Sequence, residues 1–351
     1  MKALKPQGKF NRDIDPSPLL VSEFPALAPV IVNPDLSQAF WQHEHVAVRC
    51  KRLYVLLGRT ALICIFLTMV FFDYEFTLQR VYGVSIAARV LGVAVAALGV
   101  SAQFWLIIGR IKEKWLIERF AAERLRCLKF QAFTLVPVAA TPTQLASDVA
   151  AFTRKGIARL EQELLGGRSA LYEFLPELVV PRETRDPSAT ADVIRDAFRV
   201  YESLRLEVQA QHFETQARVA DERARFPSMI SEITFALGGI LACGQIGATA
   251  WSALNGFRTV PIPDTLQPWL AFFTLLLFVL SAVLAVYQRG SGDEPHYERY
   301  KHYAREIGRI RMNRDPESTS SFLDTVSRVE RIEWRELYEF CRDGMRSNYI
   351  F

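Results

Sequence analysis

Four long stretches that are almost free of charge constrain this chain more than any other feature. They run from Leu53 to Phe72, Val90 to Gly109, Ile233 to Leu254 and Thr265 to Gln288, and Arg59 is the single charged residue within them. A helix that crosses a bilayer needs roughly 20 consecutive apolar residues, whereas the helices of a soluble core alternate apolar and polar positions. The predicted fold class is therefore all-α: an integral membrane protein with two transmembrane helical hairpins, four spans in all, and long cytoplasmic helices.

Basic residues are distributed unevenly around these stretches. The connections at 73–83 and 255–264 contain only Arg80 and Arg258, whereas the other flanks contain Arg49, Lys51, Arg52, Arg110, Lys112, Lys114, Arg223, Arg225 and Arg289. Basic flanks tend to stay in the cytoplasm. Both termini and the middle region are therefore predicted to be cytoplasmic, with the two short connections outside.

The order of apolar and polar segments predicts five regions. They are a proline-rich cytoplasmic tail at 1–40, a first hairpin with a cytoplasmic helix extension at 41–135, a cytoplasmic helical region at 136–226, a second hairpin at 227–290 and C-terminal cytoplasmic helices at 291–351. A shift of about 180 positions lays one hairpin on the other. Duplication of one module and the common geometry of any two hairpins both explain this.

Three details of the cytoplasmic helices follow from residue spacing. No proline or glycine interrupts Ile111 to Leu135, so this segment is predicted to continue the second span as one helix. Glu333 falls on the apolar stripe of the last helix, where a salt bridge to an arginine of another helix is expected. A seam for a partner helix is predicted between 189 and 226 at Val193, Ala197, Val200, Leu204, Val208, Gln211, Thr215 and Val219.

Polar residues inside or at the ends of the spans are the candidate functional residues, because charge in hydrocarbon is costly. They are Arg59, Arg89, Gln103, Glu232 and Gln245. The three charged side chains lie near span ends, where they can reach the interface instead. The two glutamines lie deeper, and each is expected either to form a hydrogen bond between helices or to face a water path.

Small residues in the spans are candidate positions for close helix packing. They are Gly92, Ala96, Gly239, Gly244 and Gly247. Four spans in one subunit enclose little space for a water-filled path. An ion channel built from this chain is therefore expected to be a homo-oligomer whose small-residue faces lie at helix contacts.

The sequence contains none of the common motifs of enzymes or metal sites. It has no phosphate-binding glycine loop, no dinucleotide fingerprint and no HExxH or GxSxG motif, and its five cysteines and five histidines show no ligand spacing. A net charge of +4 is too small and too evenly mixed to indicate nucleic acid. We therefore expect no catalytic residue, no metal and no cofactor, and a protein that is not an enzyme.

Three charged segments that contain aromatic residues resemble those of a known family. WLIERFAAERLRCLKFQAF at Trp115–Phe133 follows the first hairpin, and YERYKHYAREIGRI at Tyr297–Ile310 and VERIEWRELYEF at Val329–Phe340 follow the second. Together with the hairpins, they resemble the SLATT superfamily, the SMODS and SLOG associating two-transmembrane effector domains, with two modules in tandem. The likeness covers most of the chain after Ala39. Phe340 stands where that family often has tryptophan.

The resemblance implies a pore-forming effector of bacterial immunity in the cell inner membrane. Such an oligomer would conduct ions when triggered by a nucleotide second messenger or by a separate sensor protein, in an antiphage-type conflict system. Two other classes remain open. One is a non-conducting scaffold or receptor subunit that recruits a cytosolic partner through its cytoplasmic helices, and the other is a membrane enzyme or lipid-handling protein.

Overall fold

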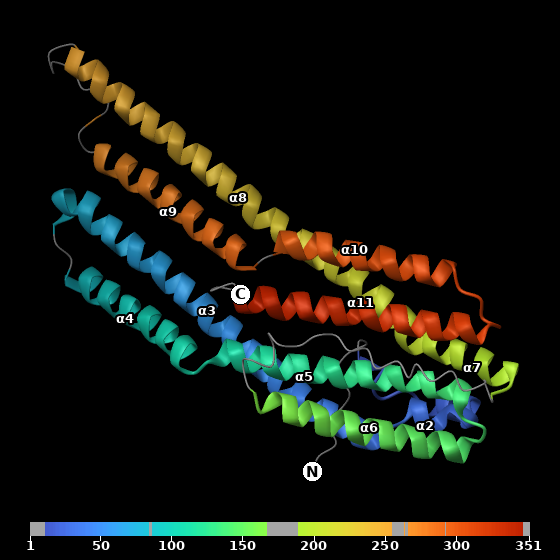
Figure 1. Ribbon diagram of the computed structural model, residues 1–351. Coiled ribbons are helices and arrows are strands. Elements are labelled where there is room, and N and C mark those ends of the chain that lie inside the picture. The colour runs from blue at the N-terminus through green and yellow to red at the C-terminus, as the bar shows by residue number, and fades with distance from the viewer. Residues whose placement is uncertain are drawn as a thin grey trace. The chain divides into compact units, whose positions relative to one another are not determined.

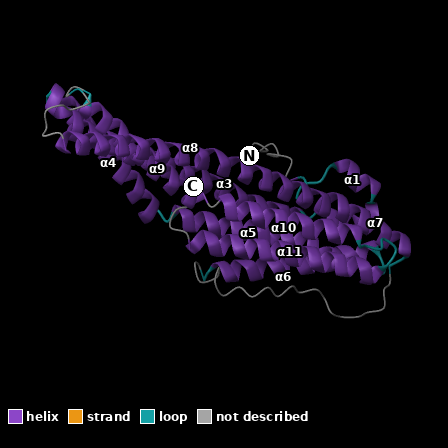
Figure 2. Cartoon of the chain, turned by 90° about the horizontal axis from the view of Figure 1, so that it is seen from above, coloured by secondary structure: helices purple, strands orange, loops and turns teal. Residues whose placement is uncertain are grey.

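The part of the chain that the structure describes is mostly helical. The computed structural model describes residues 11–83, 86–166, 189–254, 263, 266–291 and 293–346, and this part contains no strand (Figures 1 and 2). Its α-helices are α1 (Pro18–Glu23), α2 (Ala28–Ile31), α3 (Pro34–Tyr82), α4 (Ile86–Ile108), α5 (Ile111–Gln131), α6 (Pro142–Leu164), α7 (Ala191–Tyr201), α8 (Glu207–Leu254), α9 (Gln267–Ser291), α10 (Asp293–Met312) and α11 (Thr319–Arg346). Shorter turns are η2 (Pro25–Leu27), η3 (Ala132–Val138) and the π-helical turn η5 (Glu202–Leu206). The all-helical class is confirmed.

The chain forms two compact units. Residues 1–51, 112–218 and 296–346 form one, called here the polar unit, and residues 52–111 and 219–295 with 347–351 form the other, called the apolar unit. The helices α3 and α8 each belong to both units. Four helical stretches are long and apolar enough to cross a membrane, which indicates a multi-pass membrane protein: Pro25–Leu78, Ile86–Ile108, Ala191–Leu254 and Gln267–Gln288.

The polar unit is a helical bundle with an aromatic core. Phe130, Phe133 and Tyr201 pack on one another with ring centroids 5.5–6.1 Å apart. The helices α5 and α11 contact through two edge-to-face pairs, Trp115 with Phe340 and Phe120 with Trp334. Tyr303 of α10 donates a hydrogen bond to Glu339 of α11 at 2.7 Å. Long-range contacts among aromatic side chains therefore hold this unit together.

The segment predicted to be a proline-rich tail, 1–40, contributes buried residues to this core in its described part, 11–40. Leu27, Val30 and Ile31 are buried with the aromatic residues of α5 and α7. Lys129 of α5 is also buried, and its ammonium group donates to the carbonyl oxygens of Asp13 and Ile14 at 2.7 and 2.8 Å. The prolines here stand in the first turns of α1, η2 and α2, where proline is tolerated.

The predicted continuous helix from the second span through Leu135 is wrong. The helix α4 ends at Ile108, a turn follows at Gly109 and Arg110, and α5 begins at Ile111. Arg110 has φ 44°, in the left-handed region that arginine rarely adopts. The helix therefore ends beside Gly109. This is also where the apolar sequence of α4 gives way to the charged sequence of α5.

The predicted connection at 73–83 is also wrong, because α3 continues through it to Tyr82. Neither proline nor glycine occurs between Asp73 and Tyr82, so nothing in the backbone stops the helix before Gly83. Gly83 itself has φ 78°, as expected of a glycine that ends a helix. Most of the second predicted connection, 255–264, lies outside the described residues.

The predicted seam in 189–226 is half correct. Ala197, Val200 and Leu204 are buried as predicted, but Gln211 is exposed, and Gln209 and Phe213 are buried in its place. The π-helical turn η5 lies between the two halves, and it shifts the phase of the helix by inserting one residue. The predicted spacing assumed an uninterrupted α-helix, so it did not include this shift.

Candidate functional site

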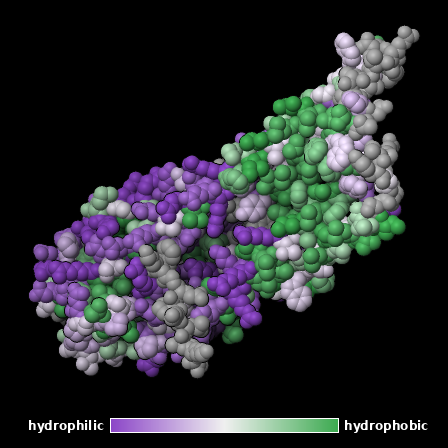
Figure 3. Space-filling model, turned by 180° about the vertical axis from the view of Figure 1, so that it is seen from behind, coloured by the Kyte–Doolittle hydropathy of each residue, from purple (hydrophilic) through white to green (hydrophobic). Residues whose placement is uncertain are grey.

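The apolar unit exposes most of its apolar side chains. Only 11–17% of the most apolar window in each of the four helices is buried. Figure 3 shows hydrophobic residues covering the visible surface of this unit. Side chains such as Phe104 and Ile107 of α4 and Ile240 of α8 are more than 60% exposed. Such a surface would be unfavourable in water and is suited to lipid.

The candidate polar residues of the spans lie in different surroundings. Arg59 is exposed, and Arg89, also exposed, pairs with Glu75 at 2.6 Å. Glu232 is exposed and accepts a hydrogen bond from Ser228 at 3.2 Å. These three charged side chains lie on the surface of the apolar unit, and they do not converge on one internal site.

The two glutamines differ from each other. Gln245 of α8 donates to the hydroxyl of Thr274 on α9 at 3.0 Å, which is one of the two roles expected for it. A second polar contact joins the same helices, because the hydroxyls of Ser231 and Ser281 lie 3.2 Å apart. Gln103 of α4 is partly buried, and whether it faces water stays a prediction.

Glycine packing is present in the first pair of spans. A Cβ added at Gly99 of α4 would lie 2.8 Å from the Cβ of Cys64 on α3, and one added at Gly92 would lie 3.2 Å from that of Phe71. Ala96 lies between them on α4 and is partly buried. Gly92 and Gly99 are seven residues apart, as are Cys64 and Phe71, which indicates one continuous contact between α3 and α4. The packing positions predicted from the sequence included Gly92 and Ala96 but not Gly99.

The glycines of α8 have a different environment. A Cβ added at Gly239, Gly244 or Gly247 would meet no atom within 4 Å, whereas Gly238, the neighbour of Gly239, faces Phe278 of α9. Within one subunit, therefore, Gly239, Gly244 and Gly247 border open space. Their predicted role in packing stays a prediction that requires a second copy of the chain.

Asp73 is an intramembrane candidate that the sequence argument missed. Its residue is 4% exposed, and neither carboxylate oxygen has a hydrogen-bond partner within the described residues. From the sequence, Asp73 is predicted to lie in the first connection, because the preceding apolar stretch ends at Phe72. The only signal that could have revealed it is the absence of any helix-breaking residue before Gly83.

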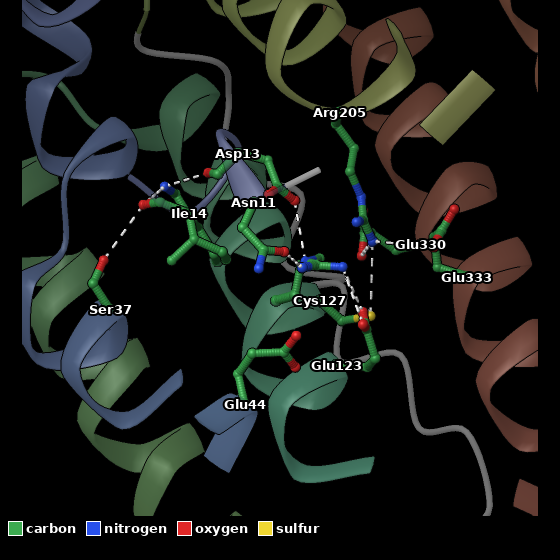
Figure 4. Close-up of polar contacts among 12 residues, drawn as sticks. Asn11, Asp13, Ile14, Ser37, Glu44, Glu123, Cys127, Arg205, Glu330 and Glu333 are labelled. Atoms are coloured by element: carbon green, nitrogen blue, oxygen red, sulfur yellow. Dashed lines mark hydrogen bonds and ion pairs between the residues drawn. The ribbon is translucent and has the colours of Figure 1, made fainter. Parts of the chain in front are cut away.

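The polar unit contains a cavity of about 230 Å³ lined by charged and aromatic side chains. Four carboxylates face it: Glu44 of α3, Glu123 of α5, and Glu333 and Glu336 of α11. Lys51, Arg119 and Arg126 are the lysine and arginine residues on its wall, together with His212 of α8. Figure 4 shows Glu44, Glu123 and Glu333 reaching this region from three different helices. None of these residues belonged to the candidate set chosen from the sequence.

Two of the carboxylates are neutralised by arginine. Arg119 pairs with Glu44 at 3.0 Å and also with Glu123, and Arg126 pairs with Glu123 at 3.0 Å. Burial alone would raise the pKa of Glu123, but the nearby guanidinium groups of Arg119 and Arg126 outweigh it and lower the pKa to about 2. Glu123 is therefore ionised and locked into a structural network.

The other two carboxyl groups of the cavity are held less closely by arginine. Glu333 lies 3.8 Å from Arg205, its side chain is 8% exposed, and its Oε1 has no hydrogen-bond partner among the described residues. Burial raises the pKa of Glu333 to about 8, against the attraction of Arg205. Burial likewise raises the pKa of Glu336 to about 7, although Arg299 acts in the opposite direction. Glu333 and Glu336 are therefore the carboxyl groups of the cavity that burial keeps protonated over part of the neutral pH range.

Arg205 is held beside the cavity by a fully buried ion pair. Its Nε and Nη2 atoms donate to the two carboxylate oxygens of Glu330 at 2.9 and 3.0 Å, and both side chains are 0% exposed (Figure 4). Tyr201 donates to the same carboxylate at 3.2 Å. The salt bridge predicted for Glu333 is therefore confirmed, but Glu330 is the closer partner of Arg205.

No group of three or more His, Cys, Asp or Glu side chains in the described ranges is arranged to hold a metal ion. The chemical character of the cavity comes from its carboxyl groups, its basic residues and its aromatic walls. Comparison of the chain with models of protein families, with curated proteins and with solved structures finds no match.

Proposed function

We propose that this protein is an oligomeric effector of the bacterial inner membrane that conducts ions when triggered. In this proposal the four apolar helices form two transmembrane hairpins, both termini are cytoplasmic, and the chain is a tandem member of the SLATT superfamily. The trigger is a nucleotide second messenger or a separate sensor protein, as the resemblance implies.

One observation supports the proposal: α3 and α8 each carry both a residue of the cavity and a polar residue of the apolar unit. The helix α3 spans Pro34–Tyr82 and carries both Glu44 of the cavity and Asp73. The helix α8 spans Glu207–Leu254 and carries both Gln209 of the cavity and Gln245. In this proposal a change in the cavity would act on the spans along these two helices.

The glycines of α8 support oligomerisation. Gly239, Gly244 and Gly247 border open space in one subunit, among apolar side chains that are themselves exposed. In a bilayer, a strip of small residues allows the backbone of a second helix to approach closely. A second copy of the chain is the partner that would satisfy this surface and enclose a path for ions.

The structure does not favour recruitment of a partner through the helix at 189–226. Its apolar face is already used inside the polar unit, where Ile194, Ala197, Phe198 and Tyr201 are buried. A cytosolic partner would have to bind a polar surface instead. The scaffold alternative therefore has less support than conduction.

Ion flux through liposomes tests the proposal. Purified full-length protein reconstituted at high protein-to-lipid ratio is expected to release trapped K⁺, and Gly244→Leu is expected to abolish both the oligomer and the flux. Ile246→Leu, at a neighbouring exposed position of α8, is the matched control and should conduct like the wild type. An oligomer that passes no ions, with or without cyclic nucleotides, would rule out conduction and favour a scaffold.

A further inference from the structure

The four carboxyl groups that line the cavity of the polar unit differ in how closely arginine pairs with them. Arg119 and Arg126 are engaged by Glu44, Glu123 and Asp13. Arg205 is engaged by Glu330 through two hydrogen bonds. Glu333, 3.8 Å from Arg205, and Glu336 are held less closely, and both lie on one face of α11.

Glu333 has a buried carboxyl oxygen that no group of the described residues donates to, and this points to a ligand. More than nine tenths of its side chain is buried, it lines the cavity, and its Oε1 has no hydrogen-bond partner within the described residues. A buried carboxylate oxygen without a donor costs free energy. An incoming N–H group or a positive charge would remove that cost.

The remaining walls are aromatic. Trp115 and Phe340 form an edge-to-face pair at 5.8 Å, and Phe213 and Tyr300 stack with ring centroids 6.2 Å apart. Aromatic faces attract cations that are partly stripped of water. The ammonium of Lys51 already lies 5.7 Å from the centroid of the Trp115 ring, so the wall accepts a primary ammonium within the chain itself.

We propose that this cavity is a binding site for a small organic cation with one or two ammonium groups, held by Glu333 and Glu336 and by the aromatic faces of Trp115 and Tyr300. The site does not depend on conduction by the spans. Its volume of about 230 Å³ accommodates a short aliphatic amine. Because ammonium binds the ionised carboxylates, binding releases the protons that they hold in the empty cavity.

The pH dependence of binding follows from the groups that surround the two carboxylates. Glu333 is faced by Arg205 of η5, by Glu123 of α5 and by Glu330 and Glu336 of its own helix. Glu336 is faced by Arg299 of α10, Arg119 and Glu123 of α5, and Glu339 of its own helix. The raised pKa values of about 8 and about 7 mean that both acids lose protons as pH rises from 6 to 8.5. Binding of a cation should tighten over this range.

Calorimetry on the full-length protein in detergent, with 1,4-diaminobutane and tetramethylammonium as probes at constant ionic strength, tests the proposal. The wild type should bind at least one probe saturably and more tightly at pH 8.5 than at pH 6. Glu333→Gln and Glu336→Gln, which keep side-chain shape but remove the charge, should each weaken binding about ten-fold. Asp324→Asn, an exposed acid of α11 outside the cavity, is the matched control and should bind like the wild type.

Lys51→Met separates a cation site from an anion site without disturbing the core, because Lys51 is exposed. Removal of its ammonium from the Trp115 wall should tighten binding of the probe cations. The proposal is overturned if neither probe binds saturably to the wild type or if Glu333→Gln and Glu336→Gln bind as tightly as Asp324→Asn. It is also overturned if inorganic phosphate or cyclic AMP binds instead and Lys51→Met weakens that binding.

Discussion

Arg205 has the largest side chain that is fully buried in the described chain, and its position explains how the polar unit tolerates charge in its core. The guanidinium meets both oxygens of Glu330 and lies 4.6 Å from the centroid of the Phe130 ring. Geometry of this quality offsets much of the desolvation cost of the two charges. It also fixes the π-helical turn that shifts the phase between α7 and α8.

Breaking this pair from one side should be more harmful than removing it. Arg205→Met leaves the Glu330 carboxylate buried without a counterion and should lower the free energy of unfolding by about 3–5 kcal/mol. Arg205→Met combined with Glu330→Leu removes both charges and should recover much of that loss. Thermal unfolding of the three proteins in one detergent measures the difference. A double variant less stable than Arg205→Met would show that the pair itself is strongly stabilising.

Glu333 should make the folded protein less stable as the pH rises. Its folded-state pKa of about 8 lies above the usual value of 4.5. The folded state therefore holds a proton that the unfolded state has lost between these pH values, and stability falls as pH rises from 4.5 to 8. Glu333→Gln should unfold at nearly the same temperature as the wild type at pH 5 and be more stable at pH 8.5, by on the order of 2 kcal/mol. Equal melting temperatures at both pH values would show that Glu333 is not held protonated.

At the scale of the helix, small residues and helix-breaking residues decide where each element lies. Gly99 brings α3 and α4 close together, Gly83 ends α3, and the turn at Gly109 and Arg110 separates α4 from α5. The apolar spacing predicted that four long helices exist but not where they end. The ends of α3 and α4 depend on backbone conformations that hydropathy does not report.

Gly99 offers a direct test of the contact between α3 and α4. In Gly99→Val the new side chain would begin 2.8 Å from the Cβ of Cys64, so the two helices must move apart. The variant should lose about 1–3 kcal/mol of stability, the usual range for overpacking. Gly308→Val of α10 is the matched control, since its Cβ meets no atom within 4 Å and Gly308 lies outside the proposed oligomer contact. A Gly99→Val protein as stable as this control would contradict the packing of the two helices.

At the scale of the whole chain, the sequence revealed the four long apolar helices far better than the cavity of the polar unit. Uninterrupted apolar stretches identify helices such as α4 and α9 because a bilayer imposes one composition on a whole span. Glu44, Glu123, Glu333 and Glu336 meet only because α3, α5 and α11 pack together, and their sequence positions span almost 300 residues. Charged positions on separate helices resemble ordinary solvated faces until the tertiary contacts are known. Glu333 was the exception, since it interrupts an apolar stripe.

The central claim is that four helices cross the bilayer and leave the polar unit on one side of it. Accessibility of single cysteines to a membrane-impermeant maleimide in intact cells tests this claim most directly. In a background with the five native cysteines replaced, Gly83→Cys and Leu266→Cys should react from outside. Ser147→Cys of α6 and Ser320→Cys of α11 should react only after the membrane is permeabilised. All four positions are exposed. Labelling of Ser147→Cys or Ser320→Cys in intact cells, or recovery of the protein in the soluble fraction without detergent, would contradict the account.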